Sequence, residues 1–104
     1  MNEIQNRPWG KFEVLAKFGV APGGDVCIKI IAVRPGQRLS YQSHRLRSER
    51  WTFVQGRGRV VLDGAESAVV AGSGVFVPVG AKHRAINDGA EADLVFVEGF
   101  HGQF

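Results

Sequence analysis

Short runs in which apolar and polar residues alternate dominate the chain, and turn residues separate these runs at brief intervals. Alternation with a period of two residues is typical of half-buried β-strands. It predicts strands over residues 11–15, 25–34, 51–55, 59–62, 67–71, 75–79, 83–87 and 94–98, with a loop over 20–24. No stretch has a convincing helical period. The pattern therefore predicts an all-β single domain over residues 1–104, built as a sandwich or a barrel.

Turn residues refine this expectation. The Asp63-Gly64 pair is among the strongest short signals for a hairpin, and Gly56-Arg57-Gly58 also indicates a hairpin-type turn between its flanking strands. Residues 1–6 are expected to form a frayed or docking arm ahead of the turn Arg7-Pro8-Trp9-Gly10.

Composition narrows the class of protein. With 44% hydrophobic and 22% charged residues among 104, the chain can bury one core and is not a disordered polyelectrolyte. The net charge of +3 and an arginine cluster without an aromatic stripe favour a solvated surface over a nucleic-acid interface. We expect no membrane partner and a cytoplasmic location, because no apolar run reaches spanning length and no stretch resembles a signal peptide. Cys27, the single cysteine, lies in an apolar run and fits a buried residue in a reducing compartment.

Four side chains suggest chemistry. Gln42 and His44 are two residues apart in an extended segment, so they leave the same face of the chain. Glu49 follows five residues later, and His83 lies far downstream among turn residues. If they converge, one glutamine, two histidines and one carboxylate would form a site for a divalent metal. Zn²⁺ is the first candidate for this ligand set, with Mn²⁺, Co²⁺, Ni²⁺ and Fe²⁺ as alternatives.

The spacing of these residues resembles that of the cupins. Gly36-x5-Gln42-x-His44-x4-Glu49-x6-Gly56 is similar to the first cupin motif (residues 36–56), with glutamine where a histidine commonly stands. Gly72-x5-Pro78-x-Gly80-x2-His83-x3-Asn87 is similar to the second (residues 72–87) at every position. The resemblance implies a small single-domain cupin, a double-stranded β-helix with a jelly-roll barrel.

Further segments resemble the type II mannose-6-phosphate isomerases, whose domain also forms the C-terminal part of bifunctional mannose-1-phosphate guanylyltransferases. These are RPWG at 7–10, VRPGQRLS at 33–40, Gln42-x-His44, Glu49-x-Trp51 and Gly80-x-Lys-His-Arg, spread over residues 7–99. The resemblance implies an aldose–ketose isomerase that binds a metal through Gln42, His44, Glu49 and His83. Arg45-Leu46 and Arg50 depart from the histidines common in that family.

Strand parity indicates residues that accompany the metal. Arg38 and Ser40 share the face of Gln42 and His44, so we expect them to contact the substrate. Lys29 is a basic residue on the face of Cys27 and Ile31, and can reach the site or extend along the barrel wall. Glu98, at the end of the last predicted strand, is a candidate proton carrier, although a surface charge or ion-pair partner is the commoner role. We take Lys29 and Glu98 as the catalytic candidates.

Three functions remain open at this point. The leading hypothesis is interconversion of mannose 6-phosphate and fructose 6-phosphate, or of a close analogue, with the phosphosugar as the small-molecule partner. Two histidines and one carboxylate also suit a non-haem iron dioxygenase. A non-catalytic metal- or sugar-binding module is the third reading. By analogy with cupins, and because sheet edges need cover, we expect a homodimer.

Overall fold

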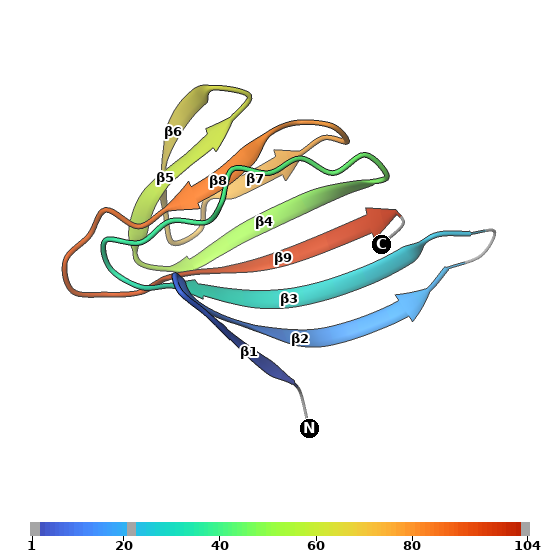
Figure 1. Cartoon of the computed structure of the whole chain (residues 1–104), viewed down its shortest axis with the longest axis horizontal. Helices are drawn as coiled ribbons and strands as arrows, with labels where there is room; N and C mark the ends of the chain where they lie inside the picture. The colour runs from blue at the N-terminus through green and yellow to red at the C-terminus, as the bar shows by residue number, and fades with distance from the viewer. Residues whose placement is uncertain (1–2, 21–22, 103–104) are drawn as a thin grey trace.

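Within the residues that the computed structural model describes, 3–20 and 23–102, the chain forms β-strands joined by turns and loops, without a helix (Figure 1). The all-β expectation is confirmed. The strands are β1 (Ile4–Arg7), β2 (Gly10–Gly19), β3 (Asp25–Val33), β4 (Arg47–Gln55), β5 (Arg57–Leu62), β6 (Ala65–Val70), β7 (Gly74–Val77), β8 (His83–Ile86) and β9 (Leu94–Gly102). In the described part of the chain no helix is long and apolar enough to span a membrane.

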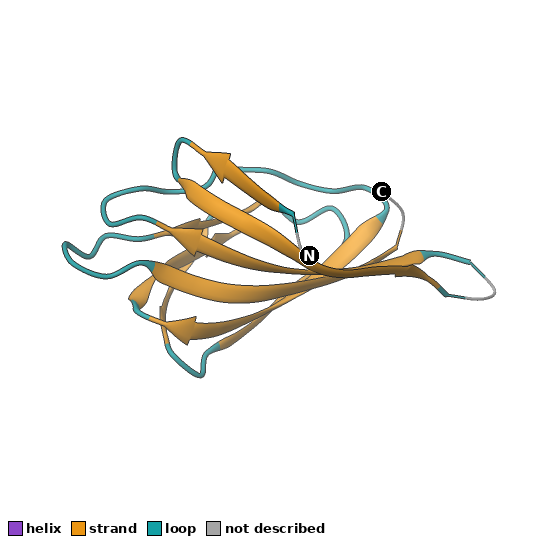
Figure 2. Ribbon diagram, turned by 90° about the horizontal axis from the view of Figure 1, so that it is seen from below, coloured by secondary structure: helices purple, strands orange, loops and turns teal. Residues whose placement is uncertain are grey.

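Two antiparallel sheets face each other. The larger sheet has the strand order β1-β2-β3-β9-β4-β7 and the smaller has the order β6-β5-β8, as the two layers in Figure 2 show. Between β3 and β4 the chain crosses to the smaller sheet, where Arg38 bridges Ile86 and Gln42 bridges His83. This crossing segment therefore covers the free edge of β8 and carries Gln42 into the space between the sheets.

Inward-facing residues of both sheets form the core. The fully buried side chains include Trp51 and Phe53 of β4 and Phe96 of β9, whose rings pack with centroids 4.6 to 6.3 Å apart. Cys27 is buried, as its apolar surroundings predicted. The aromatic core fills one part of the barrel, and polar side chains line the remaining space at the other end.

One turn prediction is confirmed and another is wrong. Asp63-Gly64 joins β5 to β6 as a two-residue hairpin, with Leu62 opposite Ala65. In contrast, β4 and β5 are not paired with each other, because β4 belongs to the larger sheet and β5 to the smaller one. The pairing of β4 with β9 shifts register between Phe53 and Gln55, and such a bulge bends the strand towards the opposite layer. At Gly56 the chain therefore crosses from the larger sheet to the smaller one.

The ends of the chain are more regular than expected. Glu3 lies just ahead of β1, whose residues Ile4 to Arg7 pair with β2, so the described part of the N-terminal arm docks as an edge strand. Strand β9 continues to Gly102, which places Glu98 in the middle of the last strand and not at its end. In the predicted loop over 20–24, residues 21 and 22 lie outside the described residues.

The buried side chain of Asn87 joins the end of β3 to the connection between β8 and β9 through hydrogen bonds. Its amide nitrogen donates to the carbonyl oxygens of Val33 at 2.8 Å and Ala92 at 2.9 Å, and its side-chain oxygen accepts from the Gly89 amide at 3.0 Å. The side chain is 1% exposed, so none of these partners can be replaced by bulk water. The network fixes the β8–β9 connection against the end of β3.

We expect Asn87→Ala to lower the free energy of unfolding by about 2–4 kcal/mol, because it leaves buried carbonyl groups without a donor. Urea unfolding followed by tryptophan fluorescence measures this change. Asn6→Ala, at an exposed position of β1, is the matched control and should change stability by less than about 0.5 kcal/mol. Equal effects of the two substitutions would contradict the assigned role of the Asn87 network.

Candidate metal centre

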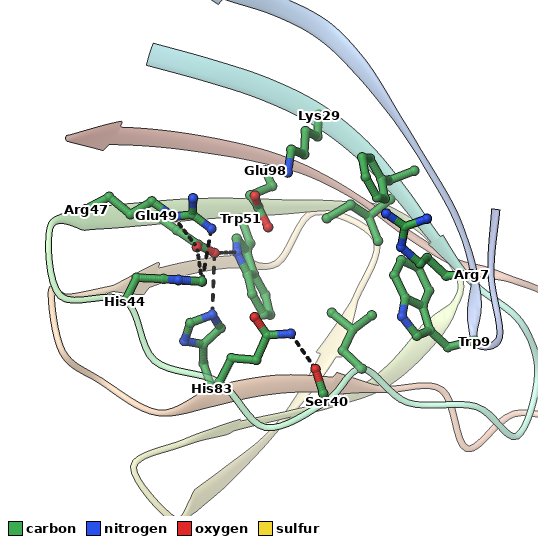
Figure 3. Close-up of a pocket in the computed structure, with 14 residues that line it drawn as sticks. Arg7, Trp9, Lys29, Ser40, His44, Arg47, Glu49, Trp51, His83 and Glu98 are labelled. Atoms are coloured by element: carbon green, nitrogen blue, oxygen red, sulfur yellow. Dashed lines mark hydrogen bonds and ion pairs between the residues drawn. The ribbon is translucent and has the colours of Figure 1, made fainter. Parts of the chain in front are cut away.

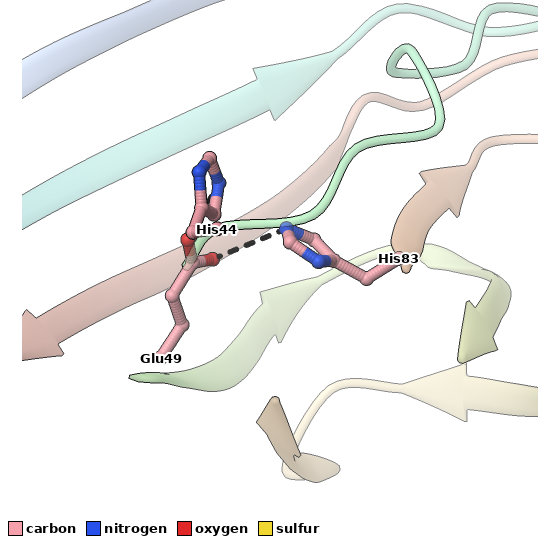
Figure 4. A group of neighbouring side chains, drawn as sticks. All are labelled: His44, Glu49 and His83. Atoms are coloured by element: carbon pink, nitrogen blue, oxygen red, sulfur yellow. Dashed lines mark ion pairs between the residues drawn. The ribbon is translucent and has the colours of Figure 1, made fainter. Parts of the chain in front are cut away.

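Three of the four expected ligands meet inside the barrel. His44 Nε2 lies 3.2 Å from Glu49 Oε2, and His83 Nε2 lies 3.7 Å from Glu49 Oε1 (Figure 4). One ligand atom from each of the three residues falls within 4.8 Å of the other two. Glu49 projects from β4 in the larger sheet, whereas His83 begins β8 in the smaller one. The two sheets thus face each other across this cluster.

A tight turn brings the two histidines together. Pro78 to Ala81 form a β-turn closed by a hydrogen bond from Ala81 N to Pro78 O at 3.2 Å, and Gly80 there adopts a φ of +83° that suits glycine. The Gly80 amide donates to the carbonyl oxygen of His44 at 2.8 Å. The backbone that carries His44 is therefore attached to the turn that precedes His83.

Gln42 enters the same site through the backbone. Its amide and carbonyl groups pair with those of His83 in both directions, at 3.1 and 2.7 Å. Residues opposite each other in such a bridge project their side chains to the same side. The Gln42 side-chain nitrogen donates to Ser40 Oγ, as the dashed line in Figure 3 shows. This leaves the side-chain carbonyl oxygen of Gln42, Oε1, as the atom that can ligate a cation.

The donor set fits a divalent metal. Ligand atoms at roughly 2.0–2.2 Å from a zinc ion lie about 3–4 Å from one another, which matches the separations of 3.2 and 3.7 Å. His83 Nδ1 is 2.9 Å from the carbonyl oxygen of Ala81. Because a carbonyl only accepts, Nδ1 carries a proton and donates it to Ala81, which leaves Nε2 as the ring atom that faces Glu49 and could ligate a metal.

Arg47 is an additional charged residue at this cluster. Its guanidinium donates from Nη2 to His44 Nε2 at 3.1 Å, lies 3.5 Å from Glu49 Oε2, and stacks 4.1 Å from the centroid of the Phe100 ring. Burial lowers the pKa of His44, and the Arg47 charge lowers it further against the opposing effect of Glu49. His44 is thus neutral, as a ligand must be, but its Nε2 lone pair is engaged by Arg47.

Trp51 orients the carboxylate. Its indole nitrogen donates to Glu49 Oε1 at 2.9 Å, and its ring packs edge-on against the His83 ring at 5.6 Å. Trp51 is also a core residue, since it is 1% exposed. Sequence reasoning missed its second role, although the Glu49-x-Trp51 spacing places both side chains on one face of β4.

Lys29 and Glu98 face the same pocket from neighbouring strands. They are direct partners in the β3–β9 pairing, and Figure 3 shows the Lys29 amine directed towards Glu98. Glu98 is 7% exposed, so the alternative of a surface charge is wrong. Burial raises the pKa of Glu98 to about 8; the nearby Glu49 carboxylate adds to the rise, whereas Lys29 and Arg47 oppose it.

Arg38 is not in this pocket, contrary to the parity argument. Leu39 and Ser40 both line the pocket, whereas Arg38 and Tyr41 line a separate hollow on the outer face of the smaller sheet. The alternation of side chains breaks between residues 39 and 40, where the crossing segment is not a continuous strand. Parity therefore places Ser40 correctly and Arg38 on the wrong side.

The whole pocket is a cavity of about 320 Å³, within the range of roughly 300–1,000 Å³ for small-molecule sites. Beyond the residues already described, Arg7, Trp9 and Phe12 line it, and the first two lie at the end away from the histidines in Figure 3. Sequence reasoning treated Arg7 only as part of a turn. Its position depends on pairing between β1 and β2, which no local pattern indicated.

This barrel and its site define a cupin. The fold is similar to that of an RmlC-like cupin from Shewanella frigidimarina, with a TM-score of 0.77 and 22% identity over 96% of this chain and 83% of that one. It is also similar to a putative sugar phosphate isomerase from Acidithiobacillus ferrooxidans, with a TM-score of 0.64 and 26% identity over 72% of this chain and 49% of that one.

The chain belongs to the family described as mannose-6-phosphate isomerase C-terminal, whose model matches residues 1–104. Among curated relatives, mannose-1-phosphate guanylyltransferase of Escherichia coli K12 is 35% identical over 83 residues, covering 80% of this chain and 16% of that protein. Alginate biosynthesis protein AlgA of Pseudomonas aeruginosa is 35% identical over 93 residues, covering 85% and 18%. The chain thus spans less than a fifth of the length of either relative.

The raised pKa of Glu98 predicts a stability change with pH in the metal-free protein. The folded state retains this proton up to about pH 8, whereas an unfolded glutamate releases it near 4.5. The folded state therefore binds more protons in this window, and stability falls as pH rises, by at most about 1.4 kcal/mol per pH unit. Urea unfolding in a chelator between pH 6.5 and 8 measures the slope; the lowered pKa of His44 opposes it near pH 6.5, so the upper part of this range reports Glu98 most directly.

Glu98→Gln should flatten that slope, because an amide has no proton to release. The comparison is between the two slopes and not between the stabilities at one pH, so a general loss of packing does not imitate the result. A slope that persists in Glu98→Gln would show that another group causes it.

The position of Arg47 predicts that it competes with a metal ion. Arg47→Met keeps an aliphatic side chain against Phe100 but removes the charge and the donor that engages His44 Nε2. We expect Co²⁺ and Zn²⁺ to bind at least about tenfold more tightly, equivalent to ~1.4 kcal/mol. Titration calorimetry and the visible spectrum of bound Co²⁺ measure this.

Arg50→Met is the matched control, because Arg50 lies in the same strand and stacks on Phe76 at 4.6 Å on the exposed side of the sheet. It should leave metal affinity unchanged. Weaker binding in Arg47→Met would mean that Arg47 supports the ligand set and does not compete for it.

Proposed function

We propose that this chain is a metal-dependent phosphosugar isomerase that interconverts mannose 6-phosphate and fructose 6-phosphate or a close analogue. The observation that supports it most directly is the convergence of a metal-ligand set and a buried carboxylic acid on one cavity. Membership of the mannose-6-phosphate isomerase C-terminal family points to the same chemistry.

His44, Glu49 and His83 would hold the metal, with Gln42 as a neutral fourth ligand. A bound divalent cation would supply Lewis acidity that stabilises negative charge on a sugar oxygen. One carboxylate among the ligands neutralises only part of the cation's charge. Trp51 and the Ala81 carbonyl hold Glu49 and His83 in orientation, so the ligand set is positioned before a metal arrives.

Glu98 would move the proton. Aldose–ketose isomerisation transfers a proton between two adjacent carbons, and the best group for this has a pKa near the working pH. Glu98 meets that condition through burial and through its proximity to Glu49. Lys29, its partner across the β3–β9 ladder, supplies a positive charge that stabilises the carboxylate after the proton has left.

The test is to load the purified protein with Zn²⁺, Mn²⁺ or Co²⁺ and follow interconversion of the two hexose phosphates. We expect Glu98→Gln to lower kcat by about 10²–10⁴-fold while metal still binds, since the amide cannot exchange the proton. His83→Ala should lose metal and activity together. Arg50→Ala, on the outer face of β4, should retain both.

No turnover of either hexose phosphate with any of these metals would overturn the isomerase proposal. Turnover that persists in Glu98→Gln would leave an isomerase but remove Glu98 from the mechanism.

A non-catalytic binding module is the second candidate, favoured by the position of Arg47 on the ligand set. Stabilisation by mannose 6-phosphate without turnover would support it. The non-haem iron dioxygenase alternative draws on the same three ligands, two histidines and one carboxylate. Oxygen uptake by the Fe²⁺-loaded protein would distinguish it from both.

A further inference from the structure

The pocket has two chemically different ends. The histidines and Glu49 occupy one end, and Arg7 and Trp9 lie at the other, with Lys29 and Glu98 along the wall between them (Figure 3). A ligand that fills the cavity would therefore meet metal ligands at one end and a guanidinium group at the other.

The β1–β2 pairing directs Arg7 into the pocket. Gln5 pairs with Phe12 and Arg7 pairs with Gly10, so Arg7 shares the inward face with Phe12. Gly10 has a φ of +154°, and a Cβ there would lie 2.0 Å from the carbonyl oxygen of Ala32. Only glycine allows the chain to reverse so close to β3, and this reversal returns β1 along the pocket rim.

Arg34 holds that reversal in place. Its side chain donates to the carbonyl oxygen of Pro8, and its backbone amide donates to the carbonyl oxygen of Trp9 at 2.9 Å. The turn that follows Arg7 is therefore bonded to the end of β3. Arg7 is fixed at its backbone, while its side chain remains exposed at the pocket mouth.

Two cations gather around one ring at this end. The Lys29 ammonium lies 4.7 Å from the centroid of the Phe12 ring, and the Arg7 guanidinium carbon lies 5.1 Å from it. Because both groups contact the same ring, an anion beside that ring would be attracted by both positive charges.

Neither cation forms a close ion pair in the part of the chain that the structure describes. In the described residues the ion pairs involve Arg47 and Arg59 as the arginines, and none involves Arg7 or Lys29. The polar contact of Arg7 is with the backbone oxygen of the adjacent Asn6. Lys29 faces Glu98, its partner in the β3–β9 pairing, so Arg7 is the cation of the two that has no carboxylate opposite it. The Arg7 guanidinium thus lines the cavity without a carboxylate partner of its own, and the Lys29 ammonium adds a second positive charge nearby.

We propose that Arg7, together with Lys29 on the adjoining wall, forms a binding subsite for a phosphate ester towards the end of the pocket opposite the metal ligands. A guanidinium presents a fork of N–H donors that matches phosphate oxygens, and an ammonium adds a point charge. The subsite rests on the proposed function in that it orients a sugar phosphate, with its reacting carbons at the ligand set and its phosphate distal. Arg7 thus takes the substrate-binding role that the sequence predicted for Arg38, which lies on the outer face of the smaller sheet.

The first experiment measures binding of inorganic phosphate to the metal-free protein in the presence of a chelator, at constant ionic strength. Titration calorimetry and thermal stabilisation are the readouts, and a metal cannot contribute to either. We expect Arg7→Ala to weaken phosphate binding by about 10- to 100-fold, the loss typical of a charge-assisted hydrogen bond. Arg38→Ala is the matched control and should bind phosphate as the unmodified chain does.

The second experiment measures steady-state kinetics of the metal-loaded protein. Arg7→Ala should raise KM for the hexose phosphate by a similar factor and leave kcat within about threefold, because the phosphate does not react. Circular dichroism and the melting temperature of Arg7→Ala check that the barrel is intact. Since the Arg7 side chain is exposed, we expect both to match the unmodified chain.

The outcomes separate the subsite from the isomerase proposal. Phosphate binding that depends on Arg7, in a protein that turns over no hexose phosphate with any metal, would support the subsite and overturn only the isomerase. Isomerase activity with an unchanged KM in Arg7→Ala would overturn the subsite and leave the function standing. Absence of saturable phosphate binding, or an equal loss in Arg38→Ala, would also overturn the subsite.

Discussion

A single buried carboxylate determines the electrostatics of this barrel. Glu49 is 2% exposed, and a charge removed from water at that depth costs several kcal/mol unless neighbours compensate it. The indole N–H of Trp51 and the guanidinium of Arg47 provide that compensation, and His44 and His83 present ring nitrogens within 4 Å of its oxygens. The arrangement of the polar end of the pocket follows from the need to satisfy this one group.

The same carboxylate explains why the site suits a divalent cation. A metal ion would take over the role that Arg47 fills, because both place positive charge beside Glu49 and both engage the lone pair of His44. It would also remove the main charge that keeps Glu98 protonated, since the effect of Glu49 on Glu98 comes second only to burial. Binding of a metal would therefore be coupled to the proton affinity of Glu98 through one side chain.

Much of the site could be predicted from the sequence, because its ligands lie at fixed positions relative to turns. Gln42 and His44 alternate in an extended segment, so their spacing places these two on one face, whereas the convergence with His83 was implied by the resemblance to the two cupin motifs. Pairing between distant strands is not encoded locally. For this reason the crossing at Gly56, the burial of Glu98 within a longer β9, and the inward direction of Arg7 had to come from the structure.

Arg38 shows where a parity argument fails. Alternation holds only while the backbone is a regular strand, and the crossing segment makes only isolated bridges to β8 at residues 38 and 42. Between them Leu39 contributes to the core and Ser40 to the pocket, which requires two successive inward side chains. This break in alternation allows Gln42 to face His83 while Leu39 packs against the core. The irregularity that makes the parity prediction for Arg38 wrong therefore also shapes the metal end of the pocket.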